Sequence, residues 1–242
     1  MRPENEVADS EFAAFLDVAE LDPPQVHRIR VEELKVQQIN LDRYSAIIAG
    51  GSPFDVSCPD HEKSNTQKGV ESFFDQLFDR VMDIDFPFLG ACSGNGLLGR
   101  YCGTSISGKY SEPVGSVTVT MTGDGENDEL LSGLPSQFLA LVGHKEACDY
   151  LPSSAKLLLT SGPCPVQMFR IKKNIYATQF HPEADAKQFV LRINTYKEHG
   201  YFKPEIAEDL ISAIVNIETP VTKEILRRFV AKYHYHQPIA PA

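Results

Sequence analysis

The chain has 242 residues, enough for one sizeable α/β domain with its own hydrophobic core. Hydrophobic residues make up 42% and charged residues 23%, a balance typical of soluble globular proteins, and no apolar run approaches the length that a bilayer requires. The formal net charge of −10 argues against a nucleic-acid-binding groove. We therefore expect a single domain over residues 1–242, with no signal peptide and with neither nucleic acid nor membrane as a partner.

The cysteines indicate a reducing compartment. There are five of them, an odd number at irregular spacing, and none forms a Cys-x-x-Cys pair. This pattern argues against a disulfide framework and against a zinc site. A cytoplasmic location fits it.

The first part of the chain contains one helix pattern and two extended stretches. Apolar residues recur at helical spacing over residues 6–20, whereas 26–36 is expected to be extended. Residues 44–49 are predicted to form a buried strand that ends at Gly50-Gly51. Two glycines at the end of a strand allow backbone N–H groups to point at a ligand, although a simple strand-to-helix turn also favours them.

The next segment carries the candidate nucleophile. A polar loop over 54–67, either a lid or a mobile surface loop, leads to a predicted helix over 68–82. An apolar run then ends in Gly90-x-Cys92-x-Gly94, which predicts a strand, a sharp turn and a helix. A thiol at such a turn is exposed near a helix N-terminus, which favours the thiolate. A buried structural cysteine is the alternative.

The rest of the chain alternates between strand and helix patterns. Strands are predicted at 109–110, 116–121, 138–146 and 156–161, and a hairpin at 166–171 and 175–180 around 172–174. Helices are predicted at 127–134, 186–197, 203–215 and 221–233, the last two within a C-terminal helical extension over about 203–235, and a frayed tail is expected from residue 234. The alternation predicts a doubly wound, mostly parallel sheet with helices on both faces and Cys92 at its C-terminal edge.

The last predicted strand delivers a histidine and, two residues later, a carboxylate. Residues i and i+2 of an extended segment point to the same side, so Glu183 can orient one nitrogen of His181 while the other faces Cys92. A cysteine nucleophile needs such a base, and the base needs an orienting group.

These two motifs together resemble the class I glutamine amidotransferases. Gly90-x-Cys92-x-Gly94 followed by Gln179-Phe180-His181-Pro182-Glu183 is most similar to stand-alone proteins that resemble the glutaminase half of GMP synthase. The resemblance implies a flavodoxin-like fold and hydrolysis of the glutamine side-chain amide by Cys92, His181 and Glu183, without metal or organic cofactor. It further implies an oxyanion hole and substrate-binding wall built from the following residues: Gly50, Gly51, Ser93 and His144.

The chain departs from the family pattern in three places. The family usually opens with a buried strand, and none precedes the helix predicted at 6–20. The start is then truncated, the sheet lacks a central strand, or another segment fills the gap. Gly96 stands where the family often has Gln or Met, and Ser93 replaces an aromatic residue or leucine. The expected substrate is therefore L-glutamine or another γ-glutamyl compound.

The partner and the alternatives follow from what the chain lacks. It has neither the Ser-Gly-Gly-x-Asp-Ser phosphate loop of an ATP-pyrophosphatase nor a Walker-type sequence, so transfer of ammonia requires a separate ATP-dependent synthetase subunit. One alternative is a γ-glutamyl peptide or conjugate hydrolase that uses the same triad with water as acceptor. Another is a non-catalytic, regulatory or redox-sensing member of the fold. The sequence leaves the oligomeric state open.

Overall fold

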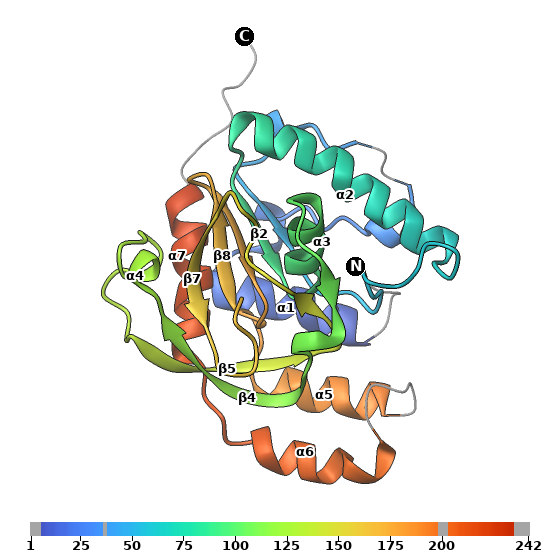
Figure 1. Ribbon diagram of the computed structural model, residues 1–242, viewed down its shortest axis with the longest axis vertical. Coiled ribbons are helices and arrows are strands. Elements are labelled where there is room, and N and C mark those ends of the chain that lie inside the picture. The colour runs from blue at the N-terminus through green and yellow to red at the C-terminus, as the bar shows by residue number, and fades with distance from the viewer. Residues whose placement is uncertain (1–5, 36–37, 198–202, 235–242) are drawn as a thin grey trace.

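A seven-stranded sheet forms the centre of the computed structural model, which describes residues 6–35, 38–197 and 203–234 (Figure 1). The strand order is β1-β2-β9-β8-β7-β4-β5, and β3 and β6 form a separate two-stranded sheet. The strands are β1 Ile47–Ala49, β2 Phe88–Ala91, β3 Ile106–Ser107, β4 Glu112–Met121, β5 Gln137–His144, β6 Ala147–Cys148, β7 Ala155–Thr160, β8 Met168–Ile171 and β9 Ile175–Thr178.

The main sheet is mixed. Strands β1, β2 and β9 are parallel neighbours, and every other neighbouring pair in this sheet is antiparallel. Five strands therefore point in one direction while β4 and β8 run the opposite way, so the sheet is mixed where a mostly parallel one was expected. The tight connection over 172–174 forces this reversal between β8 and β9, because such a short link can join only antiparallel strands.

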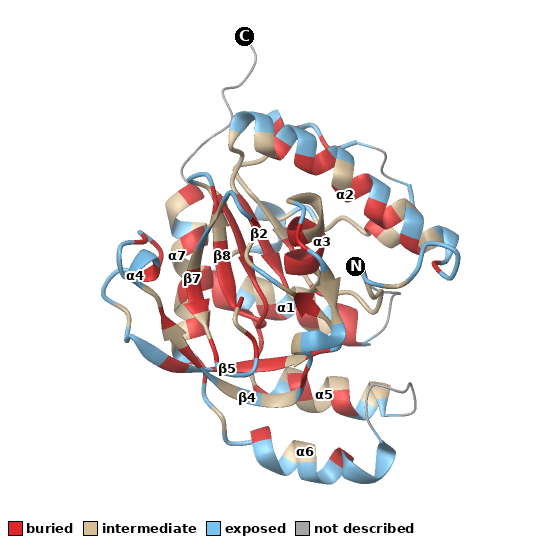
Figure 2. Cartoon of the chain, viewed as in Figure 1, coloured by how far each residue is buried: buried red, intermediate tan, exposed pale blue. Residues whose placement is uncertain are grey.

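Helices cover both faces of the sheet. They are α1 Glu6–Ala19, α2 Asn65–Ile84, α3 Ser93–Tyr101, α4 Gly123–Glu126, α5 Ala186–Tyr196, α6 Ala207–Ile214 and α7 Pro220–Tyr233. Successive side chains of β2 point to opposite faces, so Phe88 packs with α2 and Leu89 packs with α7. Figure 2 shows that the central strands β2 and β8 are mostly buried, whereas β4 also carries exposed residues. The α/β class is confirmed, and α7 forms part of the hydrophobic core.

Several local predictions were wrong. Residues 26–36 contain a 3₁₀ turn at Val31–Glu33 instead of a continuous extended stretch, and the strand expected at 109–110 is the 3₁₀ turn Gly108–Tyr110. The helix expected at 127–134 is a series of turns, and α4 begins earlier because the Thr122 hydroxyl accepts a hydrogen bond from the Gly125 N–H at 3.1 Å. Most of the tail expected to fray, residues 235–242, lies outside the described residues.

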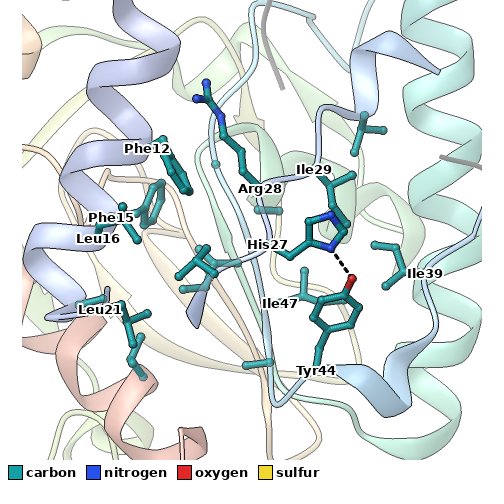
Figure 3. Close-up of a pocket in the computed structure, with 18 of the residues that line it drawn as sticks. Phe12, Phe15, Leu16, Leu21, His27, Arg28, Ile29, Ile39, Tyr44 and Ile47 are labelled. Atoms are coloured by element: carbon teal, nitrogen blue, oxygen red, sulfur yellow. Dashed lines mark hydrogen bonds between the residues drawn. The ribbon is translucent and has the colours of Figure 1, made fainter. Parts of the chain in front are cut away.

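Strand β1 lies at the edge of the sheet, and residues 1–5, where a strand ahead of α1 would have to lie, are outside the described residues. A pocket of about 400 Å³ lies beside β1, lined by side chains from α1, from α2 and from the 26–31 segment (Figure 3). Phe12, Phe15 and Ile29 make its wall largely apolar, and His27 hydrogen-bonds Tyr44 within it. The 26–31 segment thus fills part of the space next to β1. The three residues of the predicted triad are absent from the pocket lining.

Candidate active site

Three parallel strands bring the predicted site residues to one edge of the sheet. Ala49 at the end of β1 pairs with Gly90 of β2, and Ala91 at the end of β2 pairs with Thr178 of β9. The Cys92 N–H donates to the Thr178 carbonyl oxygen at 2.8 Å. The loops that follow these three strands therefore start side by side, and they carry Gly51, Cys92 and His181.

Cys92 sits at a strained turn. It is the N-cap of α3 with φ 53° and ψ −102°, a region that costs a non-glycine residue about 1–3 kcal/mol. A Cβ on Gly90 would lie 2.7 Å from the backbone C and O atoms of Gly94, and a Cβ on Gly94 would lie 3.0 Å from the Ala49 carbonyl oxygen. The two glycines are therefore needed for the backbone to double back, and the thiol at the turn is only partly buried.

We expect Gly90→Ala to lower the free energy of unfolding by about 3 kcal/mol, near the upper end for overpacking, because the atoms in its way belong to the backbone. Gly123→Ala is the matched control, since no atom lies within 4 Å of the position that its Cβ would take. Urea unfolding of both variants measures the effect. Equal midpoints for the two would show that the turn has room for a side chain.

His181 and Glu183 form a buried pair. The Nδ1 atom of His181 lies 2.8 Å from Oε1 of Glu183, and both side chains are almost completely enclosed. The other ring nitrogen remains for Cys92, which is close enough to raise the pKa of the His181 ring. The structure thus brings together the three residues that the sequence predicted as a triad.

Opposing effects set the charge state of this pair. Burial, followed by the Arg192 charge, would lower the pKa of His181, but Glu183 and Cys92 together raise that pKa to about 9. Burial would raise the pKa of Glu183, yet the charge and hydrogen bond of His181, assisted by Arg192, lower it to about 2. At neutral pH the pair is therefore an imidazolium and a carboxylate.

Arg192 and Glu11 extend the pair, and the sequence reasoning missed both. The Arg192 guanidinium donates from Nη2 to Glu183 at 3.2 Å and to Glu11 at 2.7 Å. Arg192 lies on α5, directly after the His181 loop, whereas Glu11 lies on α1 at the other end of the chain. The Glu183 carboxylate is thus part of a larger ionic network.

Ser93 fixes the loop that follows β1. Its hydroxyl accepts from the Ser52 N–H at 2.9 Å and donates to the Ser52 carbonyl oxygen at 3.1 Å. This reciprocal pair holds the Gly50-Gly51-Ser52 turn against the first turn of α3. The departure of Ser93 from the family pattern therefore has a structural reason, because an aromatic residue or leucine cannot make these bonds.

Glu146 occupies the space beside Gly96. Its carboxylate accepts from the Val56 N–H at 2.6 Å and from the Ser57 N–H at 2.8 Å. A Cβ on Gly96 would lie 3.8 Å from Glu146 Oε1 and 3.6 Å from Val56 Cγ2. Gly96 lies one helical turn after Cys92 on the same face of α3, and these two side chains occupy the space beside it. Burial raises the pKa of Glu146, against the hydrogen bonds from Ser57 and Val56.

Both ring nitrogens of His144 have hydrogen-bonding partners inside the protein. Its Nε2 lies 2.8 Å from Glu112 Oε2, and its Nδ1 lies 3.0 Å from the Glu146 carbonyl oxygen. Both ring nitrogens therefore hold the end of β5 and the loop that carries Glu146. His144 therefore supports the loop that carries Glu146.

Two clusters of described residues have the residue types of a metal site. They are Glu112–His144–Cys164 and Glu11–His181–Glu183, each with ligand atoms within 4.8 Å of one another. In the first, His144 and Glu112 already bond directly. In the second, the Arg192 guanidinium bridges both carboxylates and supplies the positive charge there. The carboxylates of both clusters thus already have partners within the protein, although Oε2 of Glu183 is buried without a hydrogen-bonding partner.

The fold and this geometry define a class of α/β proteins with a cysteine elbow facing a histidine–carboxylate pair. Residues 24–194 match the family model described as glutamine amidotransferase class-I, which is more than half of the chain. The chain belongs to the class I glutamine amidotransferase family.

Relatives in this family include subunits of GMP synthase. The chain is 31% identical over 124 residues to a subunit of the glutamine-hydrolysing GMP synthase of Methanococcus maripaludis strain C6, and the match covers 50% of this chain and 64% of that protein. It is 26% identical over 151 residues to the corresponding subunit from Methanobrevibacter smithii, and that match covers 62% of this chain and 70% of the other. The chain thus spans somewhat less than two thirds of the first relative.

Solved structures agree on the fold. A glutamine amidotransferase from Thermotoga maritima superposes with a TM-score of 0.75 at 21% identity, covering 97% of this chain and 96% of that one. The superposition includes the mixed sheet with its flanking helices. Of the helices that are described here, none combines the length and the apolar character needed to cross a membrane.

Proposed function

We propose that this protein hydrolyses the side-chain amide of L-glutamine to glutamate and ammonia. The observation that carries this proposal is Cys92 on a strained helix N-cap, at the same sheet edge as the buried His181–Glu183 pair because β2 and β9 end side by side. A nucleophile, a base and an orienting carboxylate gathered at one site are the parts that acyl transfer requires. Membership of the family and the names of the relatives support the same reaction.

The proposed steps follow from this geometry. The Cys92 thiolate attacks the amide carbon, and backbone N–H groups of Gly51 and Ser93 stabilise the oxyanion. The imidazolium of His181 gives its proton to the departing ammonia, which leaves a γ-glutamyl thioester and a neutral ring. The neutral ring then takes a proton from water, the resulting hydroxide attacks the thioester, and glutamate and the Cys92 thiolate are released.

The remaining predicted residues take supporting roles in this proposal. Gly50 belongs to the turn that presents Gly51, and Ser93 clamps that turn through Ser52. His144 holds the loop of Glu146, which lies beside Gly96 on α3. No metal or organic cofactor takes part in these steps.

We also propose that the ammonia passes to a separate ATP-dependent synthetase subunit, as the names of the GMP synthase relatives suggest. The five cysteines are free thiols, which supports a reducing compartment such as the cytoplasm.

The test combines turnover with covalent labelling. Ammonia release is measured from L-glutamine and from a panel of γ-glutamyl peptides, and the protein is then treated with diazo-oxo-norleucine and analysed by peptide mass spectrometry. We expect ammonia from glutamine and a label on Cys92. Turnover of γ-glutamyl peptides alone would replace the proposal with a γ-glutamyl hydrolase. Neither turnover nor label, with or without an added synthetase subunit, would favour a non-catalytic or redox-sensing protein.

A further inference from the structure

We propose that Arg192 and Glu11 are positioning residues that hold Glu183 against His181 and control how readily His181 gives up its proton. This inference rests on the proposed function, because it concerns the same catalytic pair. It adds the first helix of the chain to a site that is otherwise built by the strand ends and by α3 and α5.

Hydrogen bonds link four side chains in series, from His181 through Glu183 and Arg192 to Glu11. Oε1 of Glu183 accepts from His181 Nδ1 at 2.8 Å and from Arg192 Nη2 at 3.2 Å. The same Nη2 donates to Glu11 Oε1 at 2.7 Å. The side chains of Arg192 and Glu11 are only 12% and 10% exposed, so water screens this network weakly.

Helix α5 touches both members of the catalytic pair. The Arg192 guanidinium carbon lies 5.0 Å from the centre of the Phe189 ring, and the Phe189 ring meets the His181 ring edge-on at 5.8 Å. Arg192 and Phe189 are three residues apart and therefore share one face of the helix. Their packing limits the rotamers of Glu183 and His181, and Glu11 limits those of Arg192.

Four charged or titratable groups act on His181 from the elements packed around it. Glu183 lies in the same turn, Cys92 comes from the elbow, Arg192 comes from α5, and Glu11 stands behind Arg192 on α1. The positive charge of Arg192 lowers the pKa of His181. The negative charge of Glu11, which is hydrogen-bonded to Arg192, offsets part of that effect. Removing either one should therefore move the titration of His181, but in opposite directions.

We expect Arg192→Gln to move the pKa of His181 upward by about one pH unit, because a nearby positive charge is lost. We expect Glu11→Gln to move it downward by a similar amount, because the Arg192 charge is then less compensated. The double variant should return close to the wild-type value. Arg192→Lys, which keeps the charge, should titrate like the wild type while kcat falls, because an ammonium cannot reproduce the guanidinium geometry.

The measurement is NMR titration of the His181 ring in isotope-labelled protein, alongside the pH profile of kcat/KM for ammonia release. Arg228→Gln and Glu224→Gln are matched controls, since this pair lies on α7 at 3.0 Å and is partly exposed. Neither control should move the titration.

Opposite shifts for the two single variants would support the inference, since general destabilisation cannot produce them. Shifts in the same direction, or none in folded protein, would overturn it. The titration needs no turnover, so a wild type without ammonia release would count against the proposed function only. If Arg192→Gln does not fold, Glu11→Gln and Arg192→Lys decide the question.

Discussion

Cys92→Ala is expected to lower ammonia release from L-glutamine at least roughly 10³-fold, because the thioester route loses its nucleophile. Its free energy of unfolding should stay close to that of the wild type, since alanine meets the same backbone strain at φ 53°. Cys92→Gly should be just as inactive but about 1 kcal/mol more stable than Cys92→Ala, because glycine tolerates this conformation. Together, the two variants separate the chemistry of the thiol from the strain of the turn that presents it.

Ammonia assays and urea unfolding of both variants provide the measurement. Cys102→Ala is the matched control, because Cys102 follows the same helix and burial raises the pKa of its thiol to about 11. It should keep full activity and should not affect labelling at Cys92. Retained glutamine hydrolysis in Cys92→Ala would remove the central residue of the proposed mechanism.

The gathering of Cys92, His181 and Glu183 at one edge of the sheet could be predicted from the sequence because it depends mainly on short motifs and on two neighbouring strands. The turn at Cys92 needs a small residue at Gly90 because the backbone of Gly94, four positions later, would lie 2.7 Å from a Cβ there, whereas Gly94 itself lies against the Ala49 carbonyl oxygen on the neighbouring strand. His181 and Glu183 are two residues apart, and β9 beside β2 fixes where they arrive. Neighbouring parallel strands have their carboxyl ends at the same edge of a sheet, and sites form at that edge. The edge where these residues meet could therefore be inferred from the sequence.

The supporting network could not be predicted, because it depends on helix packing across the whole chain. Arg192 and Glu11 are 181 positions apart, and only the packing of α1 against α5 joins them. The available signal was an arginine beside the core residues Phe189 and Ile193 on an amphipathic helix. Such a residue more often covers a core edge with its stem than it contacts a catalytic group.

Gly96 illustrates a different limit. A missing side chain on α3 indicates a loosened pocket when it is considered alone, yet Glu146 and Val56 fill the space from two other loops. The spacing of residues along the sequence cannot reveal this compensation, because Glu146 and Val56 are far from Gly96 in the chain. The extended stretch expected at 26–36 was wrong for a related reason. Alternating residues form a strand only where a partner strand is available, and β1 pairs with β2 alone in the described sheet.

Glu183→Gln is expected to lower kcat by roughly 10²–10⁴-fold and to move the alkaline limb of the kcat/KM profile to lower pH. In the wild type, kcat/KM should fall above about pH 9, as His181 loses the proton that it must give to ammonia. Without the carboxylate charge, burial and Arg192 both act against the imidazolium, so the pKa of His181 should fall below its ordinary value of 6.5. At pH 8 the variant ring is then neutral and has no proton for the leaving group.

The same substitution should change how stability depends on pH. The raised pKa of His181 adds stability that is complete below pH 6.5 and is lost as the pH rises through about 9. The lowered pKa of Glu183 adds stability that is complete above pH 4.5 and is lost as the pH falls through about 2. The free energy of unfolding of the wild type should therefore exceed that of Glu183→Gln most between pH 4.5 and 6.5. The expected difference is about 3 kcal/mol, the usual cost of removing one partner from a buried ion pair.

Urea unfolding at several pH values and the kcat/KM profile test both parts of this prediction. Glu224→Gln, which removes a partly exposed carboxylate from its pair with Arg228, is the matched control and should leave both curves unchanged. An unchanged alkaline limb in Glu183→Gln would mean that the limb does not report His181. A stability difference that grows above pH 9 would contradict the buried ion pair itself, because the imidazolium is lost there and its attraction to Glu183 should be lost with it.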